Sequence, residues 1–191
     1  MEIKWLGNLQ SRFFYRQKIC LGDIFMQFAI GELIIYGETG VCRVVDIVEK
    51  PFLGVVQSCY QLQPIYQSCA IFTPVNNCNV YMRPIITREE AEELIANMPS
   101  VSPEIVSASS PRELTEKYDK IIKLHDCGKL IELTKSIYIK REKVLANKKK
   151  LSAIDERFLK KAEDLLFGEL AAALDIDKTA VTGYIESKVN I

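Results

Sequence analysis

The sequence predicts an α+β protein in which a small domain of short β-strands precedes a helical domain. Between Phe28 and Met82, short apolar runs alternate with glycine, proline and asparagine turn signals. After Thr87, apolar residues recur at helical spacing and segments open on capping residues. The 191 residues suffice for two small domains, each with its own core. We therefore expect an atypical extension over residues 1–25, a β domain over 26–85 and a helical domain over 86–191.

The N-terminal extension differs from the rest of the chain. It contains Trp5, the aromatic cluster Phe13–Tyr15, and the basic residues Lys4, Arg12, Arg16 and Lys18. Met26 then opens the first well-patterned segment. We favour Met26 as the natural start, with residues 1–25 arising from an early start-codon choice. The alternative is a basic, aromatic arm that binds a partner.

A hairpin opens the β domain. Leu33–Tyr36 and Val41–Val48 flank the segment Gly37–Gly40, whose two glycines permit a tight reversal because they adopt positive φ without steric penalty. Further strands are expected at 55–62, 70–74 and 80–82, with Lys50–Gly54 as a loop. Five short strands in one small domain are typical of a Tudor-like or SH3-like β-barrel, an architecture that usually binds partners.

Five helices are expected in the second half. The segment Thr87–Glu90 is a capping box, and Ser110 followed by Pro111 is a second helix start. The five helices are expected from Thr87 to about Asn97, from Ser110 after a Pro/Ser-rich connector, after a break at Asp126–Gly128, from Ser152, and from about Asp177. The Ser152 helix has the strongest apolar periodicity, with the stripe Ile154, Phe158, Ala162, Leu165, Leu166, Leu170 and Ala173.

The neutral total charge, with 25 basic and 25 acidic residues, conceals a positive middle. Residues 112–150 hold twelve basic and six acidic residues, and the basic ones are densest between Lys140 and Lys150. Such a cluster attracts phosphates through charge and counterion release. A solvated helical face is the alternative explanation, since like-charge runs are common on solvent faces.

Several function classes find no support in the sequence. No run of 18 uncharged apolar residues suggests a membrane span, no signal peptide is recognisable, and a cytosolic setting is expected. The six cysteines form no Cys-x-x-Cys pair and the chain has one histidine, so no metal site is expected. The consecutive residues His125, Asp126 and Cys127 superficially resemble a catalytic trio. Neighbours on a helix point in different directions, however, so these three would make a poor triad. We expect no enzyme activity, no cofactor and no small-molecule substrate.

Several motifs in combination resemble one family. They are Ile30–Gly37 with Gly40–Val41, Phe72–Val75, Met82–Arg83, Leu151–Arg157, Ala162–Glu163 and Gly168–Ala171. From Phe28 to about Ile191 the chain resembles the CarD family of bacterial transcription regulators, the CarD/CdnL group. The stretches His125–Ile131 and Ile185–Val189 are most similar to its clostridial-type branch.

This resemblance implies a Tudor-like domain that docks on the β subunit of RNA polymerase and a helical domain that reaches promoter DNA at the upstream edge of the transcription bubble. Such a protein acts on the stability of the open complex. The alternative, based on the basic segment alone, is a standalone nucleic-acid-binding adapter that does not depend on polymerase.

The resemblance also suggests site residues. For polymerase binding they are Lys50, which matches the family's basic contact, with Phe52 in the same loop, Phe72 in place of a second basic contact, and Arg43. For DNA they are Arg112, Leu114, Lys117, Lys120, Lys123, Lys140, Arg141 and Lys143. Many relatives insert a tryptophan into the minor groove from the region of Arg112–Leu114, which has none here. Leu114 could replace it as an apolar wedge, or could belong to the core.

Overall fold

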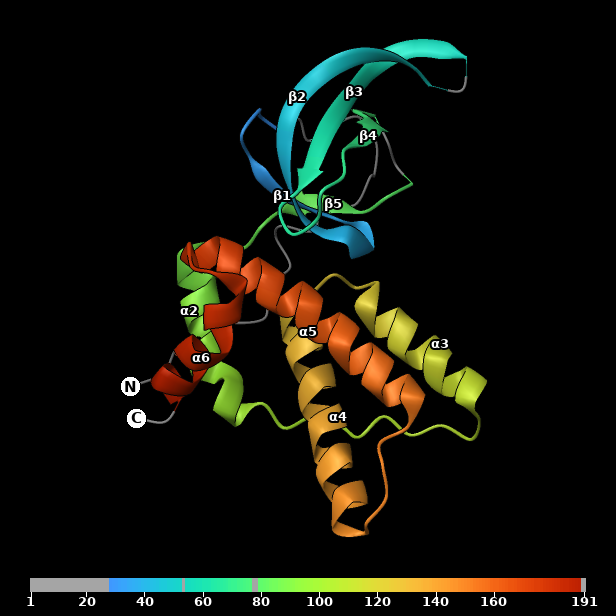
Figure 1. Cartoon of the computed structure of the whole chain (residues 1–191), viewed down its shortest axis with the longest axis vertical. Coiled ribbons are helices and arrows are strands. Elements are labelled where there is room, and N and C mark those ends of the chain that lie inside the picture. The colour runs from blue at the N-terminus through green and yellow to red at the C-terminus, as the bar shows by residue number, and fades with distance from the viewer. Residues whose placement is uncertain (1–27, 53, 77–78, 190–191) are drawn as a thin grey trace, which may run out of the picture.

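The computed structural model describes residues 28–189 apart from 53, 77 and 78. The expectations for the extension 1–25 and for a start at Met26 lie outside the described residues. The predicted α+β class is confirmed, because a five-stranded antiparallel sheet precedes five α-helices. Figure 1 shows the sheet on one side of the molecule and the helices on the other.

The sheet has the strand order β4-β3-β2-β1-β5, and every neighbouring pair is antiparallel. The strands are β1 (Leu33–Tyr36), β2 (Gly40–Phe52), β3 (Val55–Pro64), β4 (Ile71–Pro74) and β5 (Met82–Pro84). The predicted hairpin is present, with Tyr36 opposite Gly40. Its turn is the 3-10 helix η2 (Gly37–Thr39), where Gly37 and Gly40 both have positive φ.

The second strand is longer than predicted. The expected loop Lys50–Gly54 is wrong, because β2 continues through Pro51 to Phe52 and pairs Lys50 with Gln57. The sheet tolerates this proline because β1 pairs only with Gly40–Arg43, which leaves β2 as an edge strand further along. Strands β4 and β5 also begin later than expected, at Ile71 and Met82.

The sheet is curved and has a core of its own. A register shift between Val44 and Asp46 marks a bulge, which bends β2. In the described part of the chain no ladder joins the edge strands β4 and β5, and Figure 1 shows β2 and β3 curling away from the helices. The buried core residues of the sheet are Phe28, Ile34, Cys42, Val44, Tyr60 and Leu62.

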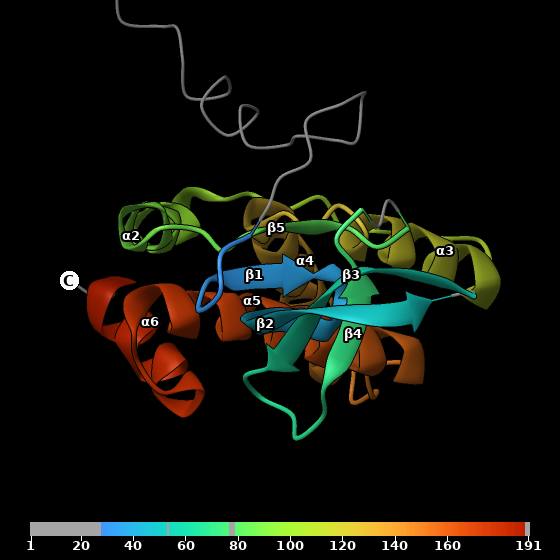
Figure 2. The ribbon, with the colours of Figure 1, turned by 90° about the horizontal axis from the view of Figure 1, so that it is seen from above.

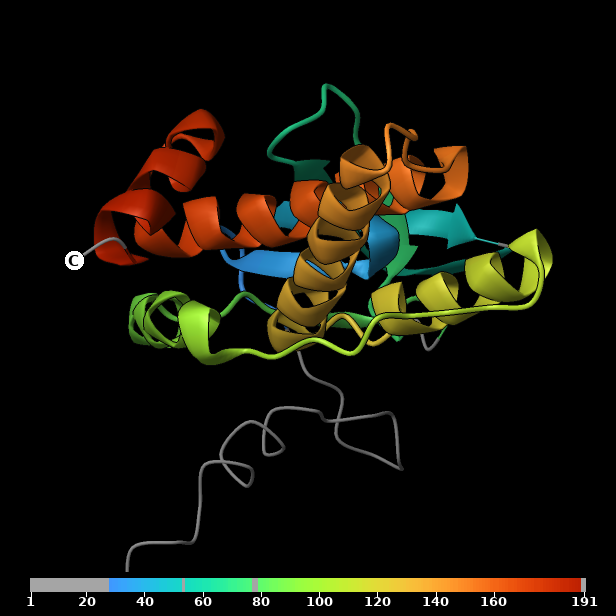
Figure 3. The same ribbon diagram turned by 90° about the horizontal axis from the view of Figure 1, so that it is seen from below.

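The helical domain is organised around α5. Its helices are α2 (Arg88–Asn97), α3 (Pro111–Ile122), α4 (Cys127–Ala146), α5 (Ala153–Leu174) and α6 (Val181–Val189), with the 3-10 helices η3 (Met98–Ser100) and η4 (Lys178–Ala180). Helix α5 contacts α2, α3, α4 and α6 as well as β2. Viewed from below in Figure 3, α4 crosses α5 between α2 and α3. The apolar stripe predicted for the Ser152 helix faces the helical core.

Helix starts follow the predicted caps. Thr87 and Glu90 form the capping box of α2, and the side chains of Ser110 and Ser152 accept hydrogen bonds at the starts of α3 and α5. The break before α4 lies earlier than expected, since Asp126 caps this helix and Cys127 already belongs to it. Each cap pairs amides that a helix start would otherwise leave without partners.

A buried ion pair joins the two halves. The carboxylate of Glu169 on α5 accepts hydrogen bonds from both terminal nitrogens of Arg83 on β5, with Nη2 at 2.8 Å. It also accepts from the backbone N–H of Ile86 at 3.0 Å and from the thiol of Cys127 at 3.2 Å. Arg83 in turn donates to the carbonyl of His125. Burial alone would lower the pKa of Arg83, but Glu169 outweighs it and the pKa is raised.

Two further contacts cross the same junction. The hydroxyl of Tyr66 donates to the carbonyl of Gly168 at 2.8 Å, and Lys161 forms an ion pair with Glu38 at 2.6 Å. Seen from above in Figure 2, α5 runs beneath β1 and β2. These polar contacts join the sheet to α5 from three different parts of the β domain.

Substituting Glu169→Ala should lower the free energy of unfolding by about 3–5 kcal/mol, because it leaves the Arg83 guanidinium buried without its counter-charge. Urea unfolding of the whole chain measures this. As a control, Glu132→Ala removes the solvent-exposed partner of Lys129 and should change stability by less than about 1 kcal/mol. Equal effects of the two substitutions would contradict the central role of the buried pair.

Candidate functional site

One candidate surface is the free edge of β2. From Val45 to Phe52 no described strand pairs with β2 on the side away from β3. Four apolar side chains at this end of the sheet are between 43% and 67% exposed: Val45, Ile47, Val55 and Val56. We call Val45–Phe52 and Val55–Val56 the edge surface. A free strand edge with exposed apolar side chains can pair with a strand of another protein.

Two of the predicted polymerase-binding residues are in contact: Lys50, in the edge surface, and Phe72, on β4. The Nζ atom of Lys50 lies 3.2 Å from the ring centroid of Phe72, a cation–π contact between β2 and β4. Phe72, which stands at the position of a second basic contact in the resemblance, therefore supports the Lys50 side chain.

The other two predicted residues lie apart from this contact. Arg43 is exposed near the start of β2, where its Nη1 donates to the carbonyl of Gly31 at 3.1 Å. Lys50 lies seven positions further along the extended strand, roughly 20 Å away. Phe52 ends β2 opposite Val55, and its side chain is outside the described part of the chain. The structure thus brings together Lys50 and Phe72 but not Arg43.

The basic residues predicted on α3 differ in their pairing. Arg112 is 88% exposed and pairs with Glu116 at 3.0 Å. Lys117 pairs with Glu113 at 2.8 Å and donates to the carbonyl of Ser107. Lys120 and Lys123 are exposed and form no ion pair within the described residues. The last two are the cations on this helix that are most available to a phosphate.

The wedge role for Leu114 requires correction. Its side chain is 9% exposed and belongs to the helical core together with Tyr118 and Ile122. An apolar wedge would have to leave this core, at a cost of a few kcal/mol for a buried leucine. The alternative assignment of Leu114 to the core agrees with the structure.

Lys140 also has a structural partner that the sequence did not reveal. Its Nζ lies 2.7 Å from the carboxylate of Asp155, which is buried beneath it. Asp155 also accepts from the hydroxyls of Tyr118 and Ser152, at 2.7 and 2.6 Å. Lys140 therefore stabilises the packing of α4 on α5, and its predicted role in DNA binding stays a prediction. On the same helix, Arg141 and Lys143 are exposed and form no ion pair in the described structure.

Burial raises the pKa of Asp155, but the hydrogen bonds from Lys140, Ser152 and Tyr118 together outweigh it. The pKa of Asp155 therefore lies below its ordinary value of 3.8, and the group is ionised at neutral pH. This charged network lies inside the helical domain, where α3, α4 and α5 pack together.

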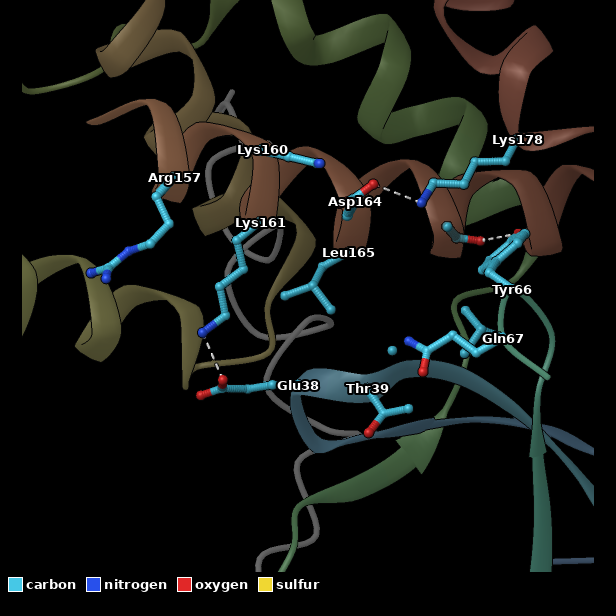
Figure 4. Close-up of a pocket in the computed structure, with 13 residues that line it drawn as sticks. Glu38, Thr39, Tyr66, Gln67, Arg157, Lys160, Lys161, Asp164, Leu165 and Lys178 are labelled. Carbon is cyan, nitrogen blue, oxygen red and sulfur yellow. Dashed lines mark hydrogen bonds and ion pairs between the residues drawn. The ribbon is translucent and has the colours of Figure 1, made fainter. Parts of the chain in front are cut away.

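A second basic site was missed by the sequence analysis. A groove of about 420 Å³ lies between the sheet and α5 and contains four cations, Arg157, Lys160, Lys161 and Lys178 (Figure 4). We call it the junction groove; its other lining residues are Glu38, Thr39, Gly40, Val41, Tyr66, Gln67, Asp164, Leu165 and Gly168. Residues 151–191 have a net charge of −3, which hid this cluster. The spacing of Arg157, Lys160 and Lys161 on one helix could have indicated it.

Two of the four groove cations are paired. Lys161 binds Glu38 at 2.6 Å, and this hydrogen bond lowers the pKa of Glu38. Lys178 binds Asp164 at 2.9 Å. Arg157 and Lys160 are exposed and form no ion pair within the described residues. Arg157 and Lys160 are therefore the groove cations most available to an external anion.

The three consecutive residues considered for catalysis have separate structural roles. The ring of His125 stacks on Tyr81 at a centroid distance of 4.6 Å, and Asp126 caps α4. Cys127 is buried and donates to Glu169, and burial raises its pKa well above the ordinary value. A thiol in that state is a poor nucleophile.

Other kinds of site find no support in the described part of the chain. No cluster of three His, Cys, Asp or Glu side chains there could hold a metal ion. None of the described helices has the length and apolar character needed to cross a membrane.

A curved sheet with a free strand edge, joined to a helical domain that exposes several cations, is typical of proteins that bind other macromolecules. Residues 28–86 match the family model described as CarD-like/TRCF RID domain, and this part of the chain belongs to that family. The matched segment, about a third of the chain, contains the whole sheet and ends just before α2. A comparison with curated proteins found no match.

The family description refers to an RNA polymerase-interacting domain, so the match suggests a role in transcription regulation. The resemblance to the clostridial-type branch lies outside the matched segment and stays a prediction.

Stability should depend on the ionisation of Asp155. Because its pKa is lowered on folding, its contribution is complete above about pH 3.8 and is lost as the pH falls through the folded-state pKa. We expect Asp155→Asn to lower the free energy of unfolding by about 3 kcal/mol at pH 7. The difference from the wild type should shrink in strong acid.

Urea unfolding between pH 7 and pH 2.5 measures this difference. Asp164→Asn is the control, because Asp164 is more than half exposed and its pair with Lys178 should contribute less than about 1 kcal/mol. A difference for Asp155→Asn that stays constant over the whole range would contradict the proposed ionisation.

Proposed function

We propose that this protein regulates transcription by binding the RNA polymerase β subunit through its sheet and promoter DNA through its helical domain. In this proposal the β domain, residues 26–85, holds polymerase, and the helical domain, residues 86–191, contacts DNA at the upstream edge of the bubble. The main support is the match of residues 28–86 to an RNA polymerase-interacting domain family. The protein would act in the cytoplasm, where bacterial polymerase works.

The edge surface is the proposed contact with polymerase. Its free backbone groups can extend a partner's sheet, and Val55 and Val56 would bury apolar area against that partner. Lys50, held over the Phe72 ring, would present its charge to an acidic group of the β subunit. Phe52 and Arg43 would flank this contact along β2.

The proposed DNA contact uses the unpaired cations of the helical domain. These are Lys120 on α3, Lys123 just after it, and Arg141 and Lys143 on α4. Arg112 and Lys117 are weaker candidates because carboxylates already pair with them. Such cations bind the phosphate backbone and fix orientation without reading base sequence.

The junction would link the two binding events. The contacts of Arg83 and Glu169 fix the sheet against α5, so a protein held on polymerase would present its basic helices at a defined place. Contacts that form better in the opened promoter would shift the equilibrium towards the open complex. The alternative function, a standalone nucleic-acid-binding adapter, is favoured only by the unpaired cations and predicts duplex binding without polymerase.

Substituting Lys50→Glu should weaken binding to a β-subunit fragment by about tenfold or more, since a like charge facing an acidic partner costs several kcal/mol. Co-elution and calorimetric titration with the purified fragment measure the loss. Lys129→Glu, an equal charge reversal on an exposed part of α4, serves as the control and should leave binding unchanged. Wild-type protein that does not bind the fragment at all would refute the polymerase contact.

Replacing Lys120, Lys123, Arg141 and Lys143 by alanine should shorten the open-complex half-life at a defined promoter. It should also flatten the dependence of duplex affinity on salt, by about 0.9 in log–log slope for each phosphate that the variant no longer neutralises. The double variant Lys129→Ala/Lys188→Ala removes cations elsewhere and should behave as the wild type. A four-residue variant with an unchanged salt slope would place the DNA contact on other residues.

A further inference from the structure

We propose that the junction groove binds a nucleoside polyphosphate, with the phosphates on the cations of α5 and the base beside Tyr66 and Gln67. This site goes beyond the function proposed above and does not rest on it, since it requires neither polymerase nor DNA. The ligand would bind as an effector and not as a substrate.

The groove is built from two walls that the fold holds face to face. One wall is the side of α5 from Arg157 to Gly168, and the other is the turn from Glu38 to Val41 together with Tyr66 and Gln67. Figure 4 shows Lys161 and Leu165 directed from α5 towards the turn, and Lys161 meeting Glu38 there. Gly168 lies eleven helical steps after Arg157, a rise of roughly 16 Å, which gives the groove an elongated shape along α5.

The two ends of the groove differ in chemistry. Arg157, Lys160 and Lys161 lie towards one end, and Tyr66 and Gln67 lie towards the other (Figure 4). Arginine and lysine donate charge-assisted hydrogen bonds to phosphate oxygens, and arginine can do so with two parallel bonds. An aromatic ring offers a stacking face to a base, and an amide side chain has both a donor and an acceptor for its edge. The fourth cation, Lys178, lies at the aromatic end, with its Nζ 5.0 Å from the Tyr66 ring centroid. The end with three cations suits the phosphates of a nucleotide, and the end with Tyr66 and Gln67 suits its base.

Tyr66 is fixed in position in the groove. Its hydroxyl donates to the Gly168 carbonyl at 2.8 Å, while 42% of the residue stays exposed. A Cβ atom at position 168 would lie 3.0 Å from the Tyr66 ring, so the ring approaches α5 closely only because residue 168 is glycine. A ring held in this way loses little conformational entropy when a ligand stacks on it.

The charge balance of the groove favours an anion. Four cations face two carboxylates, which pair with Lys161 and Lys178 and leave Arg157 and Lys160 without an ion partner among the described residues. Lys123, just after α3, is close enough to Glu38 to lower its pKa and adds to the positive potential near the same carboxylate. An incoming phosphate would therefore meet two available cations and could compete with Glu38 for Lys161.

The dimensions favour a small ligand over a duplex. A volume of about 420 Å³ lies within the range of sites for small molecules, roughly 300–1,000 Å³. The major groove of B-DNA alone is about 12 Å wide, so a duplex would contact only the rim of the groove and could not enter it.

Calorimetric titration of the full chain with GTP, ATP, inorganic tripolyphosphate, guanosine and a short DNA duplex tests the proposal. At least one nucleoside triphosphate should bind, tripolyphosphate should bind about tenfold more weakly, and guanosine should not bind measurably. The double variant Arg157→Ala/Lys160→Ala should weaken triphosphate binding at least about tenfold, because each charged hydrogen bond that it removes contributes a factor of this order.

Matched variants separate the two ends of the groove. Gln67→Ala and Tyr66→Leu should weaken the nucleotide and leave tripolyphosphate unchanged, and circular dichroism establishes that Tyr66→Leu is folded. Lys129→Ala/Lys188→Ala removes two exposed cations that do not line the groove and should bind the nucleotide as the wild type does.

Three results would overturn the proposal: no binding of either triphosphate, equal binding of tripolyphosphate and nucleotide, or loss of duplex binding alone in the Arg157→Ala/Lys160→Ala variant. None of these results bears on the β-subunit contact, which the Lys50→Glu variant tests separately.

Discussion

The ion pair between Arg83 and Glu169 is the interaction on which the arrangement of this molecule depends. The sheet and the helices have separate apolar cores, so apolar packing alone does not fix one against the other. Glu169 accepts hydrogen bonds from β5, from Ile86 just before α2 and from α4, and Arg83 donates to the carbonyl of His125. One buried carboxylate thus positions four segments that are distant in sequence.

A polar junction has consequences that an apolar one would lack. Hydrogen bonds between a guanidinium and a carboxylate are directional, so they define an orientation as well as a contact. Buried pairs of this kind are weak evidence for extra stability, but they can select one arrangement over others. For a protein proposed to bind polymerase with one half and DNA with the other, the fixed orientation is the property that matters. The same junction also creates the groove, because Glu38 and Tyr66 reach α5 from the sheet side.

The distribution of charge illustrates what counting along the chain misses. The basic segment 112–150 contains cations of two kinds: Lys140 is tied to a buried carboxylate, whereas Lys120 and Lys123 have no ion partner in the described structure. On α5 the net charge misleads in the opposite direction. Acidic residues close in sequence make residues 151–191 negative overall, although Arg157, Lys160 and Lys161 line the junction groove. Net charge in a window reports composition, but the availability of a cation depends on which carboxylates the fold places beside it.

The sequence by itself determined the features that depend on near neighbours. The hairpin around Gly37 and Gly40, the caps at Thr87, Ser110 and Ser152, and the apolar stripe of α5 involve residues a few positions apart, and each was predicted correctly. The family motifs of the first half were likewise readable, and the matched segment agrees with them.

Only the tertiary structure decided the features that depend on distant residues. In the structure Leu114 belongs to the helical core, Lys140 forms an ion pair with Asp155, and Lys50 lies over the ring of Phe72. The bond between Lys161 and Glu38 joins residues 123 positions apart, and the contact between Tyr66 and Gly168 spans 102. Local patterns set secondary structure because its hydrogen bonds are local, whereas ion pairs and grooves form only where the folded chain brings remote side chains together.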